Sequence, residues 1–115
     1  MRVHHLALRV ADCQRAAAFY GGLLGLPELR RFEEQGIVRA VWLALEGGAL
    51  MLERQLRGQG PETGSGHVVS FAVGELATWE KRLTEAGVAI TDRTDLTLFV
   101  SDPDGHRVGL SVYPL

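Results

Sequence analysis

The sequence has a single cysteine and no long apolar run, and each absence excludes a class of protein. Cys13 has no second cysteine to pair with, so an intramolecular disulfide is excluded. The strongly apolar stretches are much shorter than the roughly 20 residues that a membrane-spanning helix needs. No secretory signal pattern precedes the first expected strand. We therefore expect a cytoplasmic protein with no membrane partner.

Lysine is almost absent as well, since Lys81 is the only one, and the formal net charge at pH 7 is −2. No cluster of basic residues offsets this charge, so nucleic acid is not an expected partner. The positive charge is nearly all arginine, which favours planar, bidentate contacts with anions. With 46% hydrophobic and 23% charged residues, a chain of 115 residues is expected to form one globular domain.

Residues 3–10 alternate in the manner of a half-buried strand. Leu6, Leu8 and Val10 fall on one face and His5, Ala7 and Arg9 on the other. The first set is expected to pack against a helix, and the second to face the interior of a cup.

A helix, several strands and a glycine-rich segment follow in the first half. Asp12 can cap a helix that Gly25 ends. Strands are expected at residues 37–45 and 49–54, with a weaker one at 28–32. Residues 57–66 are rich in glycine and polar residues, which predicts a linker.

The second half repeats this order. A strand is expected at 67–73 and a helix at 75–86, followed by strands at 88–92, 97–101 and 107–113. When Val10 is aligned with Val73 without gaps, Leu8 meets Phe71 and Leu6 meets Val69. The sequence therefore predicts an α+β fold of two βαβββ modules, residues 1–56 and 67–115. Because neither half can bury both faces of its sheet alone, the halves, or two chains, must close around a shared interior.

Several motifs resemble those of the vicinal oxygen chelate superfamily, which includes glyoxalase, bleomycin-resistance and extradiol dioxygenase proteins. They are His-Leu-Ala-Leu-Arg-Val-Ala-Asp at 5–12, Ala-Ala-Phe-Tyr at 17–20, Leu-Leu-Gly-Leu at 23–26, Glu-Ala-Gly-Val at 85–88 and Phe-Val-Ser-Asp-Pro-Asp-Gly-His-Arg-Val at 99–108. The resemblance covers essentially the whole chain. It implies a curved mixed-sheet cup with helices outside, and a homodimer, because such small proteins close their cups by pairing modules within or between chains.

The resemblance also implies where a metal would bind, since metal-dependent members place one ligand on the first and one on the last strand of each module. His5 occupies the first of these positions, whereas Met51 and Gly109 stand where the two carboxylates are expected. Val68 stands opposite His5 in the repeat. Lactoylglutathione lyase activity is therefore not expected.

Two interpretations of the site remain open from sequence. In one, His5, Glu53 and His67 form a two-histidine, one-carboxylate site for one divalent ion (Zn, Ni, Mn, Fe or Co), which requires a bulge that turns His67 into the cup. In the other, no cofactor is required, and these side chains are a polar cup residue, a rim carboxylate and a solvated histidine.

The function hypotheses follow these two interpretations. The first is a binding protein that holds a small polar or aromatic molecule in its cup through side chains that include Arg9, Arg39, Trp42 and Tyr113. The second is a divalent-metal-dependent lyase, isomerase or dioxygenase that acts on adjacent oxygens of a small substrate. The fold hosts many chemistries, so the sequence does not identify the ligand.

Overall fold

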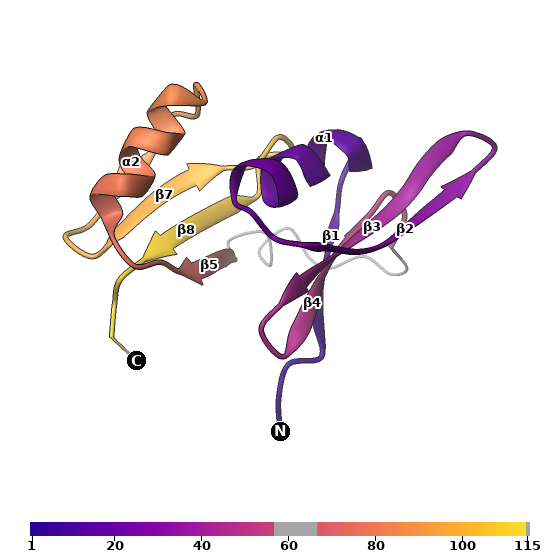
Figure 1. The fold of residues 1–115 in the computed structure, drawn as a ribbon, viewed down its shortest axis with the longest axis horizontal. Helices are drawn as coiled ribbons and strands as arrows, with labels where there is room; N and C mark the ends of the chain where they lie inside the picture. Colours follow the sequence, from indigo (N-terminus) through magenta and orange to yellow (C-terminus); the bar gives the residue numbers. More distant parts are fainter. Residues whose placement is uncertain (57–66, 115) are drawn as a thin grey trace. The chain divides into compact units, whose positions relative to one another are not determined.

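The computed structural model describes residues 1–56 and 67–114. The chain divides into two compact units, Met1–Gln59 and Gly60–Leu115, and each is an α+β module with one four-stranded mixed sheet (Figure 1). The predicted linker, residues 57–66, lies outside the described residues. Within the described ranges, no helix has the length and apolar character needed to cross a membrane.

The first unit has the predicted βαβββ order. Its strands stand in the order β1-β4-β3-β2, with β1 parallel to β4 and the other neighbours antiparallel. The elements are β1 (His5–Arg9), α1 (Cys13–Ala17), η1 (Ala18–Leu23), β2 (Glu28–Glu34), β3 (Ile37–Leu45) and β4 (Gly48–Glu53).

The helical segment begins as predicted and changes its winding after one turn. The Asp12 carboxylate accepts a hydrogen bond from the Arg15 backbone N–H at 3.0 Å and so caps α1. From Ala18 the chain winds as a π-helix, which was not predicted, and this segment buries Phe19 and Tyr20. Gly25, with φ of 86°, follows the end of the segment as expected.

Burial follows the alternation predicted for residues 3–10 from Leu8 onward, whereas Leu6 and Ala7 are both half-buried. Leu8 and Val10 are 3% and 2% exposed, whereas His5 and Arg9 are exposed. The helix packs on β3 and β4. The core of the first unit consists of Leu8, Val10, Cys13, Ala16, Ala17, Phe19, Tyr20, Val38, Ala40, Val41, Leu43, Ala49, Leu50 and Leu52.

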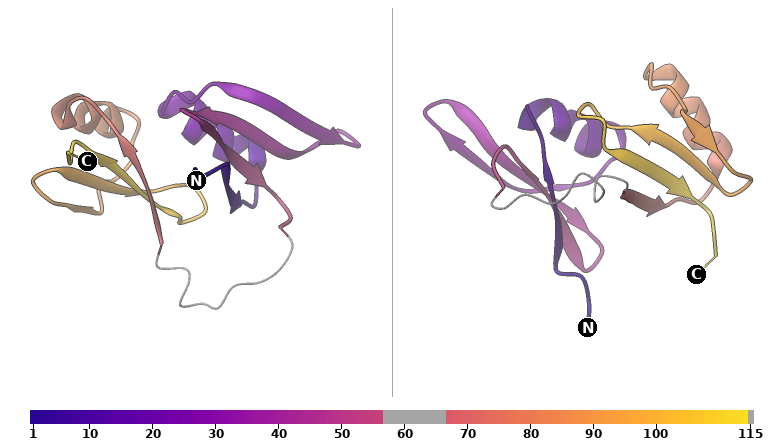
Figure 2. Two further views of the ribbon diagram at one scale, coloured as in Figure 1. Left: turned by 90° about the horizontal axis from the view of Figure 1, so that it is seen from below. Right: turned by 180° about the vertical axis from the view of Figure 1, so that it is seen from behind.

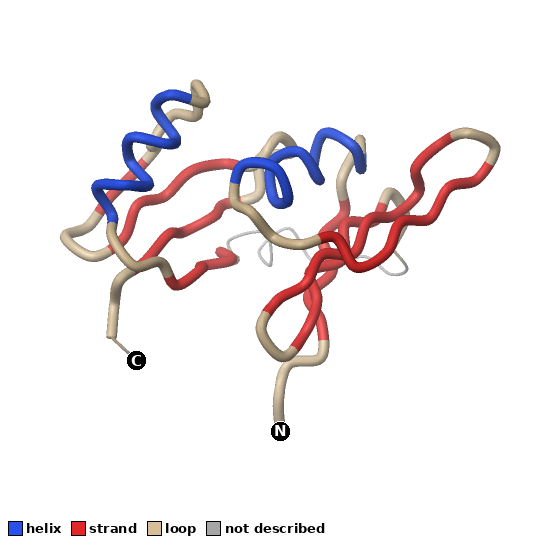
Figure 3. Tube along the Cα trace, in the orientation of Figure 1, coloured by secondary structure: helices blue, strands red, loops and turns tan. Residues whose placement is uncertain are grey.

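The hairpin of β2 and β3 is the longest in the molecule among the described residues (Figure 3). Its two-residue turn, Gln35 and Gly36, has positive φ at both positions, 54° and 76°. Such a turn matches the twist of the strands that it joins. Pairing with β3 extends β2 from the predicted 28–32 to Glu34.

The second unit repeats the arrangement, with strand order β5-β8-β7-β6 and β5 parallel to β8. Its helix packs on β7 and β8 (Figure 2), and Leu83, Leu98, Val100, Val108 and Leu110 form its core. The elements are β5 (Val68–Ala72), α2 (Leu76–Glu85), β6 (Asp92–Arg93), β7 (Thr97–Ser101) and β8 (Arg107–Ser111).

Three strands of the second unit are shorter than predicted, and one of them is β5, which was expected at 67–73 and spans Val68–Ala72. Of the strand expected at 88–92 only Asp92 lies in a strand, the two-residue β6 (Asp92–Arg93), and the Val88 backbone N–H donates to the Leu83 carbonyl at the end of the helix. The last strand ends at Ser111 rather than at Tyr113.

The turn between β7 and β8 is organised by one buried carboxylate. Asp102 is 5% exposed, and its Oδ1 accepts the backbone N–H groups of Asp104 and His106, both at 2.8 Å. Gly105, with φ of 86°, completes the reversal. This turn fixes the register of the β7–β8 hairpin, in which Phe99 pairs with Gly109.

Candidate functional site

Each sheet has one face covered by its helix and one that its own helix leaves open. The strand registers order the side chains of the first open face into rows, because paired residues of neighbouring strands point the same way. The middle row is Arg30, Trp42, Met51 and Ala7, and the next row is Phe32, Ala40, Glu53 and Arg9.

Four of the residues predicted to form a site come together at the end of β4. Glu53 is the register partner of Arg9, and its Oε1 accepts a hydrogen bond from Trp42 Nε1 at 3.0 Å. Arg39 lines the same hollow as Glu53 and lies 3.8 Å from the Glu34 carboxylate. Arg9 donates from Nη2 to the Leu56 carbonyl at 2.9 Å. The first open face therefore combines an indole ring, a carboxylate and two guanidinium groups.

Sequence reasoning missed two further residues on this face. The rings of Phe32 and Trp42 lie 5.0 Å apart. The Arg30 guanidinium stands 4.8 Å from the Phe32 ring centre and 5.9 Å from that of Trp42. The alternation of Arg30 and Phe32 along β2 was the signal that could have placed both side chains on this face. It was not used, because only a weak strand was expected there. Together these three side chains form a cation–aromatic cluster beside Glu53.

The other predicted site residues lie elsewhere. His5 pairs in register with Ala49, four residues before Glu53 on β4. At the rise of a parallel strand this is about 13 Å along the sheet, so the structure does not bring His5 and Glu53 together. The His5 ring contacts that of His4, with the two Nδ1 atoms 2.9 Å apart. Tyr113 follows β8, and its side chain is exposed.

His67 lies in the second unit, one residue before β5 begins. The ladder between β5 and β8 starts at Val68, paired with Arg107, and runs without a register shift. The His67 ring lies 6.2 Å from that of His106, whose neighbour Arg107 belongs to the open face. The bulge that would turn His67 toward the open face is not present in this ladder.

The second open face has its own middle row, Asp92, Phe99, Gly109 and Ser70. A Cβ atom on Gly109 would stand 2.7 Å from Ser70 Oγ and 3.4 Å from Phe99 Cε1. The space of the missing side chain is therefore already filled by Ser70 and by the Phe99 ring.

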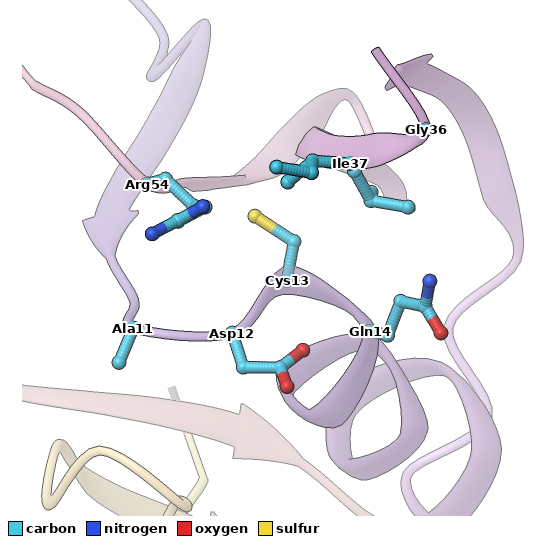
Figure 4. A pocket seen from close by; sticks show the side chains of 8 residues that line it. Ala11, Asp12, Cys13, Gln14, Gly36, Ile37 and Arg54 are labelled. Atoms are coloured by element: carbon cyan, nitrogen blue, oxygen red, sulfur yellow. The ribbon is translucent and has the colours of Figure 1, made fainter. Parts of the chain in front are cut away.

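Cys13 faces a hollow at the start of α1 that Asp12, Gln14, Ile37 and Arg54 also line (Figure 4). The thiol itself is buried, at 1% exposure, and donates to the Arg39 carbonyl at 3.3 Å. Burial raises the pKa of this thiol, and the nearby Glu53 carboxylate raises it further. A thiol held in the neutral form is a poor nucleophile, so Cys13 has the properties of a packed residue.

The chain matches one protein family over most of its length. The model of the Glyoxalase/Bleomycin resistance protein/Dioxygenase superfamily matches residues 2–110. The chain belongs to this superfamily. Among curated proteins, no sequence matches the chain.

Several solved structures share the fold of this chain at low sequence identity. A glyoxalase/dioxygenase from Nostoc punctiforme has a TM-score of 0.77 and 22% identity, over 99% of this chain and 92% of that one. The fosfomycin resistance protein FosX from Mesorhizobium loti also has 0.77, with 15% identity over 99% and 93%. The antibiotic binding protein TnmS3 from Streptomyces sp. CB03234 has 0.74, with 23% identity over 96% and 94%.

The residues of this chain do not fit the metal site that metal-dependent members of the superfamily imply. Of the four expected ligand positions only His5 has a nitrogen or oxygen ligand, and the others are Met51, Val68 and Gly109. Met51 offers only a thioether, and the space beside Gly109 is filled by neighbours. In the part of the chain that the structure describes, no three His, Cys, Asp or Glu side chains are grouped to hold an ion.

Proposed function

We propose that this protein is a glyoxalase/bleomycin-resistance-like binding protein that holds a small polar or aromatic molecule on its open sheet surface without a complete metal site. One observation carries the proposal: Glu53, the carboxylate nearest to the expected ligand position in the first unit, accepts the Trp42 indole N–H. Glu53 thus serves to orient an aromatic ring on the open face, at a distance from His5.

The first open face has the chemistry of a small-molecule site. Such sites are mainly apolar and aromatic, with a few polar groups that fix the orientation of the ligand. Trp42 and Phe32 supply the rings. Arg9, Arg39 and Glu53 supply charge at one end of the same face. Tyr113, also predicted as a ligand residue, stays a prediction.

The name of one structural neighbour supports a binding role, since that neighbour is an antibiotic binding protein. Another neighbour is a fosfomycin resistance protein, a name that does not state how it acts. Because the antibiotic binding protein is below 25% identical to this chain, it supports the class of function and not a particular ligand.

Trp42 fluorescence tests the proposal directly. The chain has two tryptophans, so Trp79→Phe leaves Trp42 as the only indole. We expect at least one compound among bleomycin, fosfomycin and a set of small aromatic acids to change this emission in a saturable way. Arg9→Gln should lower the affinity for that compound by about tenfold, because a charge-assisted hydrogen bond is lost. Arg15→Gln, on the exposed side of α1, is the matched control and should leave its affinity unchanged. If no compound produces a saturable change, the proposal is contradicted.

The alternative function, a divalent-metal-dependent lyase, isomerase or dioxygenase that uses His5, Glu53 and His67, makes an opposite prediction. It requires about one metal ion per chain and loss of that ion in both His5→Ala and His67→Ala. The separation of His5 and Glu53 along β1 and β4 weighs against it.

We also infer a homodimer, because each module has one sheet face that its own helix leaves open. Sedimentation should show the dimer at micromolar concentration. A monomer alone at that concentration would contradict this inference. A cytoplasmic location stays a prediction from the sequence.

A further inference from the structure

The second open face contains an arginine whose guanidinium lies over an aromatic ring. The Arg107 guanidinium carbon lies 4.1 Å from the centre of the Phe99 ring, a close cation–aromatic contact. Phe99 pairs in register with Gly109 on β8 and with Asp92 on β6. Arg107 therefore extends from β8 across the sheet toward β6.

Gly109 makes this arrangement possible. A Cβ atom there would approach Phe99 Cε1 to 3.4 Å, Ser70 Cβ to 3.3 Å and Ser70 Oγ to 2.7 Å. Without that atom, the phenyl ring leans over the β8 backbone and fills the space that a glycine otherwise leaves in a sheet. The glycine that removes a metal-ligand position thus creates a platform for a guanidinium.

Asp92 engages only one end of this guanidinium. Arg107 Nη2 donates to Asp92 Oδ2 at 3.3 Å, and the two side chains are 46% and 63% exposed. An ion pair this exposed contributes little in water. An incoming anion can therefore approach the guanidinium, whose orientation is already restricted by the ring.

The surroundings of Arg107 favour an anion. Apart from Phe99, the neighbouring open-face positions on β5, β7 and β8 are hydroxyl residues or small apolar ones, and Asp92 is the one carboxylate among the described residues of these rows. Ser70 in the row of Phe99 and Ser101 in the row of Arg107 are both exposed. The open-face hydroxyl residues are Ser70, Thr97, Ser101 and Ser111.

We propose that Arg107, stacked on Phe99, is the oxyanion-recognising residue of the second open face, and that the ligand of this protein is a small organic acid with a carboxylate or phosphate group. A guanidinium binds either group through two parallel N–H donors. This inference rests on the proposed function, because it takes the open sheet surface as the binding surface.

The test uses benzoate, phenyl phosphate and neutral benzamide as probes, with the backbone amide signals of ¹⁵N-labelled full-length protein as readout. Benzoate or phenyl phosphate should shift the signals of Gly109 and Ser70 in a saturable way, whereas benzamide should not. The two anions distinguish a carboxylate ligand from a phosphate ligand.

Three variants sharpen the test. Arg107→Gln should lower the affinity for the anion at least about tenfold, because charge-assisted hydrogen bonds are lost. Asp92→Asn should raise the affinity for the anion by about twofold to threefold, because a competing carboxylate is removed. Lys81→Gln removes the same charge on the exposed side of α2 and should change nothing. Dispersed amide spectra of all three show that they fold.

Three results would overturn the proposal: equal shifts with benzamide, an Arg107→Gln affinity within twofold of the parent, or weaker binding in Asp92→Asn. A ligand that changes Trp42 emission while the Gly109 and Ser70 signals stay fixed overturns this inference alone. If neither site responds to any probe, the proposed function fails with it.

Discussion

The two middle rows of the open faces occupy equivalent places in the two modules and are filled differently. Ala7, Met51, Trp42 and Arg30 of the first correspond to Ser70, Gly109, Phe99 and Asp92 of the second. In both, the expected carboxylate is absent and an aromatic side chain stands on the neighbouring strand. The arginine over the ring comes from β2 in the first unit and from β8 in the second. The two modules therefore place an aromatic ring at the same position of the sheet, and the side chains around that ring differ.

The two cores also differ. Among the described residues, fourteen hydrophobic side chains are buried in the first unit and five in the second. Because the core of the second unit is so small, the stability of this unit should depend strongly on each of its buried side chains.

The largest expected effect is therefore in the cores. Leu52 and Leu110 occupy equivalent places and are 0% and 1% exposed. Each substitution to alanine should lower the free energy of unfolding by about 2 to 5 kcal/mol, through lost burial and a cavity. Urea unfolding measures both. Leu29→Ala, at a side chain that is 59% exposed, is the control. A cost below about 1 kcal/mol at Leu110 would show that the second core is more tolerant than we infer.

Filling the gap at Gly109 should have the next largest effect. Gly109→Ala should cost about 1 to 3 kcal/mol, because the new Cβ atom meets Ser70 and Phe99. Ser70→Ala removes the Oγ atom at 2.7 Å, so the cost should be smaller in the double variant than the two single costs predict. Gly74→Ala, where no atom lies within 4 Å, is the matched control. Strict additivity at Gly109 and Ser70 would contradict the packing described here.

Removing the indole donor should have a moderate effect on the first unit. Trp42→Phe retains a ring and loses the hydrogen bond to Glu53, so the free energy of unfolding should fall by about 1 to 2 kcal/mol. In a Glu53→Ala background the same substitution should cost less. An equal cost in both backgrounds, measured by urea unfolding, would mean that the hydrogen bond contributes nothing.

The smallest expected effect depends on pH. Arg93 donates two hydrogen bonds to Glu80, and this contact, with the charge of Arg93, lowers the pKa of the Glu80 carboxyl. The stabilisation is therefore present above the unfolded pKa and is lost as pH falls through the lowered folded value. Glu80→Gln should slightly lower the urea concentration at the unfolding midpoint at pH 7 and leave it unchanged at strongly acidic pH. Glu85→Gln, in a 4.0 Å pair on the same helix, is the control. A difference between Glu80→Gln and the parent that persists in strong acid would exclude this ion pair as its source.

The sequence predicted the elements where the apolar pattern and the turns agree. The bounds of β3 and β7 were predicted to the residue, because alternating apolar residues end at glycine-containing or proline-containing turns. The π-helical turn and the short β6 could not be predicted, because each depends on backbone hydrogen bonds that composition does not encode. β2 was underestimated, since its length comes from pairing with β3.

The candidate site was partly predictable for the same reason. Strand parity placed Arg9 and Glu53 on one face, and the structure pairs them. The hydrogen bond from Trp42 to Glu53 depends on side-chain rotamers, and the Arg30 stack depends on the β2 register. The role of Gly109 as space for Phe99 required the position of a neighbouring strand.

The absence of a complete metal site is best tested by metal analysis of untagged protein, purified in buffer supplemented with divalent ions. We expect far less than one equivalent per chain, because Met51, Val68 and Gly109 stand at three of the four expected ligand positions. A content near one equivalent per chain that is lost in His5→Ala would contradict this expectation.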